Sequence, residues 1–157
     1  MSENILAPVP MSLPLPAALA GRTVVVVGGS SGIGLAAGEL LASVGADVVL
    51  AARDGGRLAA AVERVKAAGG TVRGVTGDGA DERDLERLLA EAGRVDHVLV
   101  TAGGFAGGAF LDTPVDELRQ AVDARFWGAY GAARAAARVM EPGGSITFSV
   151  DGGQSLA

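Results

Sequence analysis

Glycine and serine residues that directly follow a run of valines have the types and spacing needed to hold a phosphate group. Val24–Val27 lead into Gly28-Gly29-Ser30-Ser31-Gly32-Ile33-Gly34. The glycines at 28, 32 and 34 have a G-x-x-x-G-x-G spacing, a variant of the dinucleotide-binding turn. A helix that begins near Gly32 would direct its free N–H groups and the positive end of its dipole at the phosphates. We therefore predict dinucleotide binding here; the alternative is a purely structural turn.

Such a turn needs a strand before it and a helix after it, and the chain repeats this alternation. Strands are predicted at Thr23–Val27, Asp47–Ala52, Thr71–Thr76, Asp96–Thr101 and Ser145–Val150. Helices are predicted at Gly32–Val44 and Arg57–Ala68. A third helix is predicted after its cap Asp81, with Leu85, Leu88 and Leu89 on its buried face. A fourth is predicted from Thr113-Pro114 to about Met140, loosened at Gly128 and Gly131. Parallel neighbours need such crossovers, so we expect an α/β, Rossmann-like, doubly wound parallel sheet in the order 3-2-1-4-5. Its ligand crevice would lie between strands one and four.

Composition excludes several classes of partner and site. The 157 residues carry a net charge of −5 without a basic run, which argues against nucleic acid. Cysteine is absent and His97 is the only histidine, so we expect no disulfide and no metal site. Residues 1–20 are rich in proline and lack Lys and Arg, which predicts a flexible arm and not a signal peptide. We predict one dinucleotide-binding domain over 21–157, no membrane segment and a cytoplasmic protein.

The chain resembles the short-chain dehydrogenase/reductase family over about residues 19–153. The resemblance rests on the glycine turn and on Val48-Val49-Leu50-Ala51-Ala52-Arg53, Gly77-Asp78-Gly79, Val100-Thr101-Ala102-Gly103 and Pro142-Gly143-Gly144-Ser145-Ile146. It implies a nicotinamide dinucleotide cofactor. Asp78 and Gly79 would then flank the adenine, and Thr101, Ala102 and Gly103 would line the adenosine ribose. The candidate phosphate-binding residues are Gly28, Ser30, Ser31, Gly32, Ile33 and Gly34, although serines in such a turn are often only turn residues.

Arg53 is informative about which dinucleotide is preferred. Proteins that select NAD usually place an acidic residue at the end of the second strand, where it binds the ribose hydroxyls. Here Ala52 leaves that position uncharged, and Arg53 offers a fork of donors suited to a 2′-phosphate. We therefore predict that NADP(H) is preferred over NAD(H). The alternative is a solvated arginine paired with Asp54.

The catalytic pair that the resemblance implies is not found in this sequence. Family members use a tyrosine to protonate the developing alkoxide, and a lysine four residues later lowers the pKa of that tyrosine. Tyr130 is the only tyrosine, and Arg134 follows it where lysine is expected. Tyr130 also lies in the helix before the fifth strand and not in the helix after it. We interpret it as a packing residue with an exposed hydroxyl.

Other positions of the implied active site are also altered. The family's serine at the end of the fifth strand aligns with Val150 or Asp151, which leaves Ser149 as a weak catalytic candidate. Arg125 stands where the long helix would carry an asparagine. It could bind an anionic substrate or a phosphate, or form a salt bridge on the helix surface.

The resemblance further implies that a later helix and two more strands, with most of the substrate pocket, lie beyond Ala157. We therefore expect a C-terminally truncated sheet in which the fifth strand is an open edge. In that strand Ile146, Phe148 and Val150 alternate with hydroxyl residues, which predicts one buried face. An open edge invites pairing with another chain, and in this family the counterpart of the alanine-rich segment 129–137 packs in subunit interfaces. We predict a homodimer or a complex with a second protein.

Three functions remain open from the sequence. The first is an NADP(H)-dependent oxidoreductase acting on a carbonyl or alcohol, with its missing catalytic groups supplied by a partner chain or by an unusual local arrangement. The second is a catalytically inactive dinucleotide-binding protein with a role in assembly or regulation. The third is a non-redox enzyme that uses Asp151 or Asp112 as acid and base.

Overall fold

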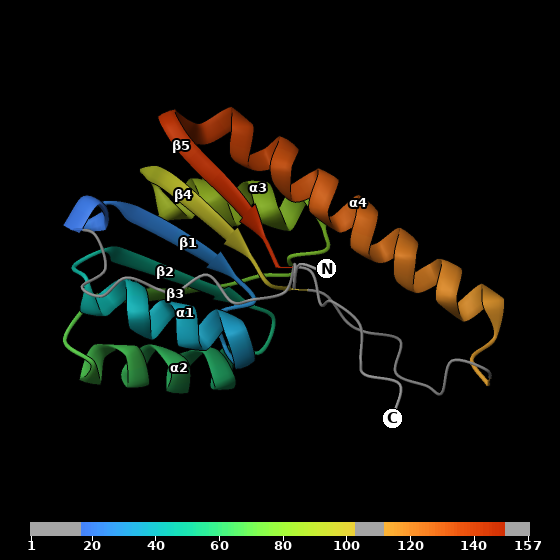
Figure 1. Ribbon diagram of the computed structural model, residues 1–157, viewed down its shortest axis with the longest axis horizontal. Helices are drawn as coiled ribbons and strands as arrows, with labels where there is room; N and C mark the ends of the chain where they lie inside the picture. The colour runs from blue at the N-terminus through green and yellow to red at the C-terminus, as the bar shows by residue number, and fades with distance from the viewer. Residues whose placement is uncertain (1–16, 103–111, 150–157) are drawn as a thin grey trace, which may run out of the picture.

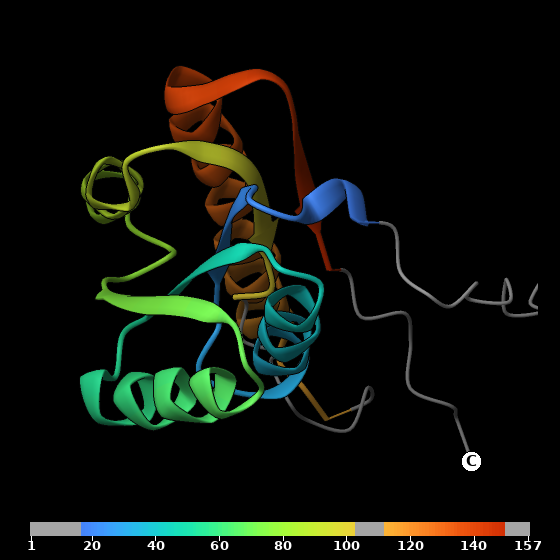
Figure 2. The same cartoon turned by 90° about the vertical axis from the view of Figure 1, so that its left-hand side faces the viewer.

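Five parallel strands form a single sheet between two pairs of helices (Figures 1 and 2). The computed structural model describes residues 17–102 and 112–149. In chain order the elements are η1 (Ala17–Leu19), β1 (Thr23–Val27), α1 (Gly32–Ser43), β2 (Asp47–Ala52), α2 (Gly55–Ala67), β3 (Thr71–Thr76), α3 (Glu82–Ala92), β4 (Val95–Val100), α4 (Val115–Val139) and β5 (Met140–Phe148). The strand order β3-β2-β1-β4-β5 confirms the predicted doubly wound topology.

The two faces of the sheet are buried by different helices. Val25 and Val27 of β1 face the core formed with α3 and α4, whereas Val24 and Val26 face the core formed with α1 and α2. Successive side chains of a strand point to opposite faces, so a central strand covered on both sides is apolar throughout. This is why the valine run predicted a central strand correctly.

Local sequence explains the starts of the second and third helices. Asp54 and Asp81 occupy the N-cap positions of α2 and α3, and each carboxylate accepts a hydrogen bond from a backbone N–H three residues later. The predicted apolar residues of α3 are buried: Leu85, Leu88 and Leu89. The α2 helix begins two residues before its predicted start, because the Asp54 carboxylate accepts a hydrogen bond from a backbone N–H of its first turn.

The edge strand β5 begins earlier than predicted. The sequence predicts Ser145 as its first residue, but Pro142-Gly143-Gly144 already lies within Met140–Phe148. The ladder with β4 is irregular there, since Val95 pairs with Met140 and His97 pairs with Ser145. An edge strand tolerates proline and a bulge because one side of its backbone needs no partner strand. Ile146 packs against the core as predicted, whereas Phe148 is exposed, and Val150 lies outside the described residues.

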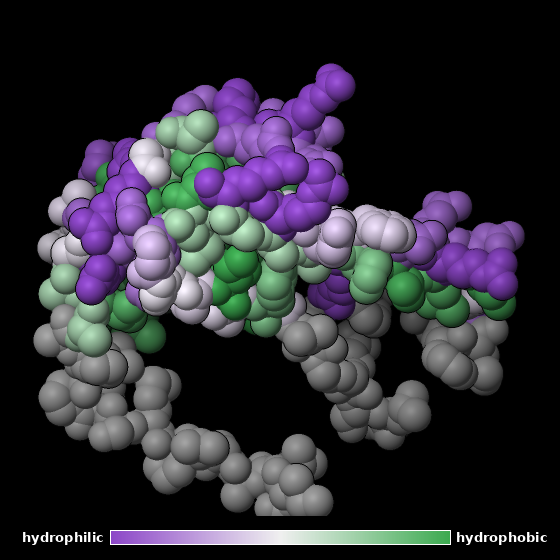
Figure 3. All heavy atoms as spheres, turned by 90° about the horizontal axis from the view of Figure 1, so that it is seen from above, coloured by the Kyte–Doolittle hydropathy of each residue, from purple (hydrophilic) through white to green (hydrophobic). Residues whose placement is uncertain are grey.

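The long helix α4 is continuous and only partly packed. It is not interrupted at Gly128 or Gly131, and Pro114 precedes it as the N-cap residue, without a side-chain cap, instead of starting its first turn. Its second half buries Ala132, Ala135 and Ala136. Its first half projects from the body, with hydrophobic side chains along it (Figures 1 and 3). The exposed large hydrophobic residues of this first half are Val115, Leu118, Val122, Phe126 and Trp127, and exposed Tyr130 follows them.

A buried aspartate joins β4 to β1 at the amino-terminal end of the sheet. The Asp96 carboxylate accepts hydrogen bonds from the backbone N–H of Thr23 (2.9 Å), from Arg94 (2.8 Å) and from Arg22 (3.2 Å). The Thr23 N–H is the largest cause, followed by Arg94, of a pKa that falls from 3.8 to about 2. Asp96 is therefore a charged, fully partnered link between the two central strands.

Residues 17–19, which the sequence places in the N-terminal arm, form the short helix η1, and Leu19 packs against the core on the α1 side. The preceding residues of the arm, 1–16, lie outside the described part of the chain. No helix within residues 17–102 and 112–149 has the length and hydrophobicity required to cross a membrane.

Candidate functional site

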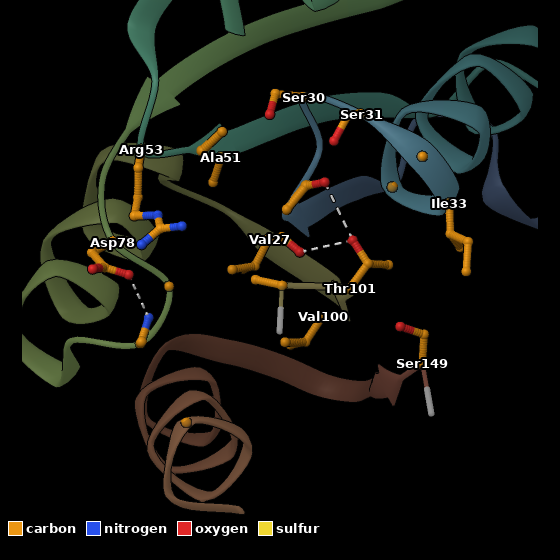
Figure 4. Close-up of a pocket in the computed structure, with 18 of the residues that line it drawn as sticks. Val27, Ser30, Ser31, Ile33, Ala51, Arg53, Asp78, Val100, Thr101 and Ser149 are labelled. Carbon is orange, nitrogen blue, oxygen red and sulfur yellow. Dashed lines mark hydrogen bonds between the residues drawn. The ribbon is translucent and has the colours of Figure 1, made fainter. Parts of the chain in front are cut away.

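A cavity of about 560 Å³ opens at the carboxyl ends of β1, β2 and β4, where the strand order reverses. Figure 4 shows the side chains that surround it. The predicted cofactor-binding residues within the described chain all line it: Gly28, Ser30, Ser31, Gly32, Ile33, Gly34, Arg53, Asp78, Gly79, Thr101 and Ala102. Gly103 lies outside the described residues. The fold thus brings together residues from four separate segments, and their role in binding stays a prediction.

The glycine turn is fastened to the end of β2 by its own backbone. Gly28 has a φ of 93°, a conformation that favours glycine, and its N–H donates to the carbonyl oxygen of Ala51 (2.8 Å). The N–H of Gly29 donates to the same oxygen (3.1 Å). Gly32, at the start of α1, has a φ of 53°. The turn therefore has one defined shape, set by glycine at two positions.

Gly34 lets α1 approach the turn and β4 closely. A Cβ atom at Gly34 would overlap the carbonyl oxygen of Gly28 and the hydroxyl of Thr101. The Thr101 hydroxyl is within hydrogen-bond distance of two backbone oxygens, that of Val27 (3.1 Å) and that of Gly28 (3.3 Å) (Figure 4). Any larger residue at 34 would push the N-terminus of α1 away from the cavity. Close packing explains this glycine fully, and it also places the helix end where a ligand would lie.

The first turn of α1 has donors to offer an anion. Ser31 is the N-cap residue with extended backbone (φ −161°, ψ 172°), and its side chain makes no cap hydrogen bond. The first N–H groups of an α-helix have no partner within the helix, and the helix dipole is positive at this end. A glycine-lined approach beside such a helix end fits a diphosphate group.

Arg53, which directly follows β2, lies at the opposite side of the cavity from Ser149 (Figure 4). Arg53 is exposed and forms no ion pair within residues 17–102 and 112–149. Its expected alternative partner, Asp54, instead faces Arg57, with 3.9 Å between carboxylate oxygen and guanidinium nitrogen, and accepts the backbone N–H of Arg57 at 2.9 Å. The guanidinium of Arg53 is therefore available at the rim of the cavity.

Hydrogen bonds fix the loop that carries Asp78 and Gly79. The N–H of Asp78 donates to the Asp84 carboxylate (2.9 Å), and the Asp78 carboxylate accepts the N–H of Ala80 (2.9 Å). The Asp78 N–H, and after it the Arg87 side chain, lowers the pKa of Asp84. Asp84 thus remains charged at neutral pH and holds the loop against the cavity.

The weak catalytic candidate Ser149 and the other residues weighed for the active site have separate positions. Ser149 lines the cavity beside β4, where its N–H donates to the Val100 oxygen (3.0 Å). Tyr130 is 52% exposed on α4, does not line the cavity, and packs edge-to-face on Trp127 with 6.0 Å between ring centroids. Arg125 is half-buried and lines the cavity from α4. Asp151 lies outside the described residues.

Sequence reasoning missed the contribution of the α2 N-terminus. Asp54 and Arg57 line the cavity beside Arg53, and so does Gly128 of α4. The signal for Asp54 and Arg57 was present, because a helix that follows β2 must begin at the carboxyl end of the sheet. No local pattern marks Gly128, which reaches the cavity through the packing of α4.

Comparisons with known proteins give one consistent result. Residues 22–155 match the short chain dehydrogenase family. An L-rhamnose 1-dehydrogenase (NAD(P)(+)) from Sphingomonas sp. is 38% identical over 136 residues, which cover 82% of this chain and 54% of that protein. A 3-ketodihydrosphingosine reductase from Aspergillus fumigatus is 36% identical over 126 residues, covering 73% and 34%.

Solved structures agree with this result. A short-chain dehydrogenase/reductase from Serratia marcescens has a TM-score of 0.72 and 33% identity, over 83% of this chain and 55% of that one. A dehydrogenase/reductase from Sinorhizobium meliloti has a TM-score of 0.74 and 31% identity, over 84% and 54%. The chain thus spans about half of the length of these solved structures, and it spans a smaller share of some relatives, such as the Aspergillus fumigatus reductase.

Proposed function

The chain belongs to the short-chain dehydrogenase/reductase family, and we propose that its cavity binds NADP(H) in preference to NAD(H) as a carbonyl or alcohol oxidoreductase. The observation that carries the preference is the guanidinium of Arg53 at the cavity rim, which has no ion-pair partner among the described residues, while Asp54 caps α2 through the Arg57 N–H. A charge-assisted hydrogen bond to a 2′-phosphate contributes roughly 1.5–3 kcal/mol. The family implies the nicotinamide cofactor; the preference is our proposal.

Each part of the cavity has a distinct task in this proposal. The N–H groups of the α1 first turn and the hydroxyls of Ser30 and Ser31 hold the diphosphate. Asp78 and Gly79 flank the adenine, and Thr101 and Ala102 line its ribose. Arg53 lies at one end of the cavity, so the nicotinamide would extend toward the other end, beside Ser149. When bound, the cofactor supplies a hydride acceptor or donor.

The proton that accompanies hydride transfer needs a donor at that second end. Tyr130 faces outward from α4, and Arg134 after it pairs with Glu82 (3.3 Å), so neither is placed for this task. Ser149 is the hydroxyl residue at the β5 end of the cavity in the described part of the chain. An unassisted serine is a weak acid, which favours a second candidate function: dinucleotide binding without turnover, with a role in assembly or regulation.

A titration of Arg53→Ala tests the cofactor preference. We expect NADPH binding, measured by calorimetry, to weaken by about 10- to 100-fold, because 1.4 kcal/mol corresponds to a factor of ten. NADH binding should stay within about twofold of wild type. Arg83→Ala is the matched control, because Arg83 is an exposed arginine that does not line the cavity. Equal losses for both dinucleotides would remove the role of Arg53 in selecting the 2′-phosphate.

Turnover separates the two candidate functions. NADPH is incubated with saturating protein and a panel of aldehydes and ketones, and its absorbance is followed. Saturable binding without oxidation of NADPH favours the non-catalytic function. Oxidation that Ser149→Ala abolishes without changing the affinity for NADPH supports the oxidoreductase with Ser149 as proton donor.

We also propose that two copies of the chain, or this chain and a second protein, associate through the first half of α4. Its exposed residues include an aromatic group, in which Phe126 and Trp127 pack edge-to-face with 5.0 Å between ring centroids. Exposed aromatic clusters of this kind are typical of interfaces.

A further inference from the structure

The loop between β3 and α3 is held on its α3 side by the carboxylate of Asp84. This carboxylate accepts the backbone N–H of Asp78 through Oδ2 (2.9 Å) and the Nη2 of Arg87 through Oδ1 (3.0 Å). The same Nη2 also donates to the carbonyl oxygen of Thr76, the last residue of β3 (2.9 Å). Asp84 and Arg87 therefore connect the end of β3, the loop and the first turn of α3 in one hydrogen-bonded group.

The opposite side of the loop lies against the carboxyl ends of β1 and β2. The N–H of Gly77 donates to the carbonyl oxygen of Ala52, the last residue of β2 (3.0 Å). A Cβ atom at Gly79 would overlap the side chain of Val27, the last residue of β1. The loop is thus confined between these strands and α3, and the Asp84 contact is what ties it to the helix.

Hydrogen bonds fix the peptide groups on both sides of Asp78. In the peptide group before it, the N–H is the one that Asp84 accepts. In the peptide group after it, the Asp78 carbonyl oxygen accepts the N–H of Asp81 (3.1 Å). A planar trans peptide directs its C=O and N–H to opposite sides. The N–H of Gly79 therefore points away from the start of α3.

The loop offers two polar groups to the cavity, which Asp78 and Gly79 both line (Figure 4). One oxygen of the Asp78 carboxylate accepts the N–H of Ala80 (2.9 Å). Its other oxygen and the N–H of Gly79 have no hydrogen-bond partner within residues 17–102 and 112–149. A hydrogen-bond acceptor and a donor are thus available on consecutive residues.

Adenine is the purine that complements this pair of groups. Its amino group is a donor and lies next to a ring nitrogen that is an acceptor. Hypoxanthine and guanine carry an oxygen in place of that amino group, and this oxygen would face the Asp78 carboxylate. Two acceptors that face each other are both left without a partner, and a site built from hydrogen bonds rejects such an analogue strongly. Selection of the base then depends on the orientation of the loop.

We propose that Asp84, supported by Arg87, is a positioning residue that gives the cavity its specificity for an adenine base. Neither side chain lines the cavity. Asp84 acts by fixing the Asp78 carboxylate and the Gly79 N–H in the orientation that adenine requires. The inference rests on the proposed binding of a nicotinamide dinucleotide, but not on the preference for NADP(H) or on turnover.

Exchange of the base tests the proposal. The affinities of NADPH and of its hypoxanthine analogue are measured by calorimetry for wild type and for Asp84→Ala, and the same is done with NADH and its hypoxanthine analogue. We expect wild type to bind the adenine form at least about tenfold more tightly, because the analogue leaves polar groups unpaired. Asp84→Ala should reduce this ratio to within about threefold, because the loop is no longer tied to α3.

Asp81→Ala is the matched control. Asp81 caps the same helix by accepting the N–H of Asp84 (2.9 Å), and it does not line the cavity. Loss of this cap destabilises α3 without removing the acceptor of the Asp78 N–H, so the ratio should stay within about twofold of wild type. Arg87→Ala should lower the ratio, and the double variant should equal Asp84→Ala, because both side chains act through one contact. Circular dichroism checks that all variants fold.

The outcomes separate this inference from the proposed function. A ratio that is unchanged in Asp84→Ala overturns the inference and leaves dinucleotide binding in place. Equal losses of the ratio in Asp84→Ala and Asp81→Ala also overturn it, since they assign the effect to the stability of α3. Wild type that binds both base forms equally shows that the loop does not select adenine. Wild type that binds neither natural cofactor overturns the proposed function together with the inference.

Discussion

Glycines in the glycine turn and in the helix α4 differ in how closely their surroundings pack against them. Gly34 is surrounded so closely that a Cβ atom would overlap the Gly28 oxygen and the Thr101 hydroxyl, whereas a Cβ atom at Gly131 would meet nothing within 4 Å. The first region is fully packed around a cavity, and the second projects with exposed aromatic side chains. Within the described residues the glycine turn is thus closely packed, while the first half of α4 exposes large hydrophobic side chains.

Alanine substitution at these two glycines gives the largest contrast. Gly34→Ala should lower the free energy of unfolding by about 1–3 kcal/mol, because the turn and α1 must separate to admit the methyl group. Binding of NADPH should be lost with it. Gly131→Ala should raise the free energy of unfolding by about 0.5–1 kcal/mol, since alanine is the better helix former. Urea unfolding measures both, and equal effects at the two sites would contradict the comparison.

The link that Asp96 forms between β1 and β4 should depend on pH. Asp96→Asn should lower the free energy of unfolding at pH 7 by about 1–3 kcal/mol, because it removes the charge that Arg22 and Arg94 face. The folded pKa of about 2 is below the ordinary value of 3.8, so the wild-type advantage is present above pH 4 and is lost as the pH falls through 2.

Urea unfolding of the two proteins at pH 7 and between pH 4 and 2 checks this prediction. The difference between wild type and Asp96→Asn should shrink steadily over the acid range. A difference that stays constant from pH 7 to pH 2 would show that the charge of Asp96 is not the cause.

The smallest expected effect on folding is at Trp127. The side chain is 60% exposed, so Trp127→Ser should change the free energy of unfolding by less than about 0.5 kcal/mol. Association should weaken by roughly 30-fold, because a tryptophan at an interface contributes about 2 kcal/mol or more. Light scattering over a concentration series measures this effect.

Val139→Ser, at the packed end of α4, is the control for Trp127→Ser and should leave association unchanged. Wild-type protein that remains monomeric at micromolar concentration, without a co-purifying partner, would show that the first half of α4 is not an association surface.

The strands and their order could be predicted because their causes are local. The bounds of β1, β2 and β3 agree with the predicted ranges. Apolar runs define β1 and β2, and glycines lie directly before and after β3. The start of β5 could not be predicted, because Pro142-Gly143-Gly144 is tolerated only where the strand forms a sheet edge. The continuity of α4 through Gly128 was also missed, since the helix gains its stability from packing of its second half.

The amino-acid sequence by itself determined the fold class, the glycine turn and the cation at the end of β2. Each depends on residues that are neighbours in the chain, where hydrophobic periodicity and the conformational freedom of glycine act directly. Only the tertiary structure decided that Arg53, Asp78 and Thr101, which come from separate segments, line one cavity, and that Tyr130 lies outside its lining. These are outcomes of which surfaces meet when distant segments pack, and no local pattern encodes them.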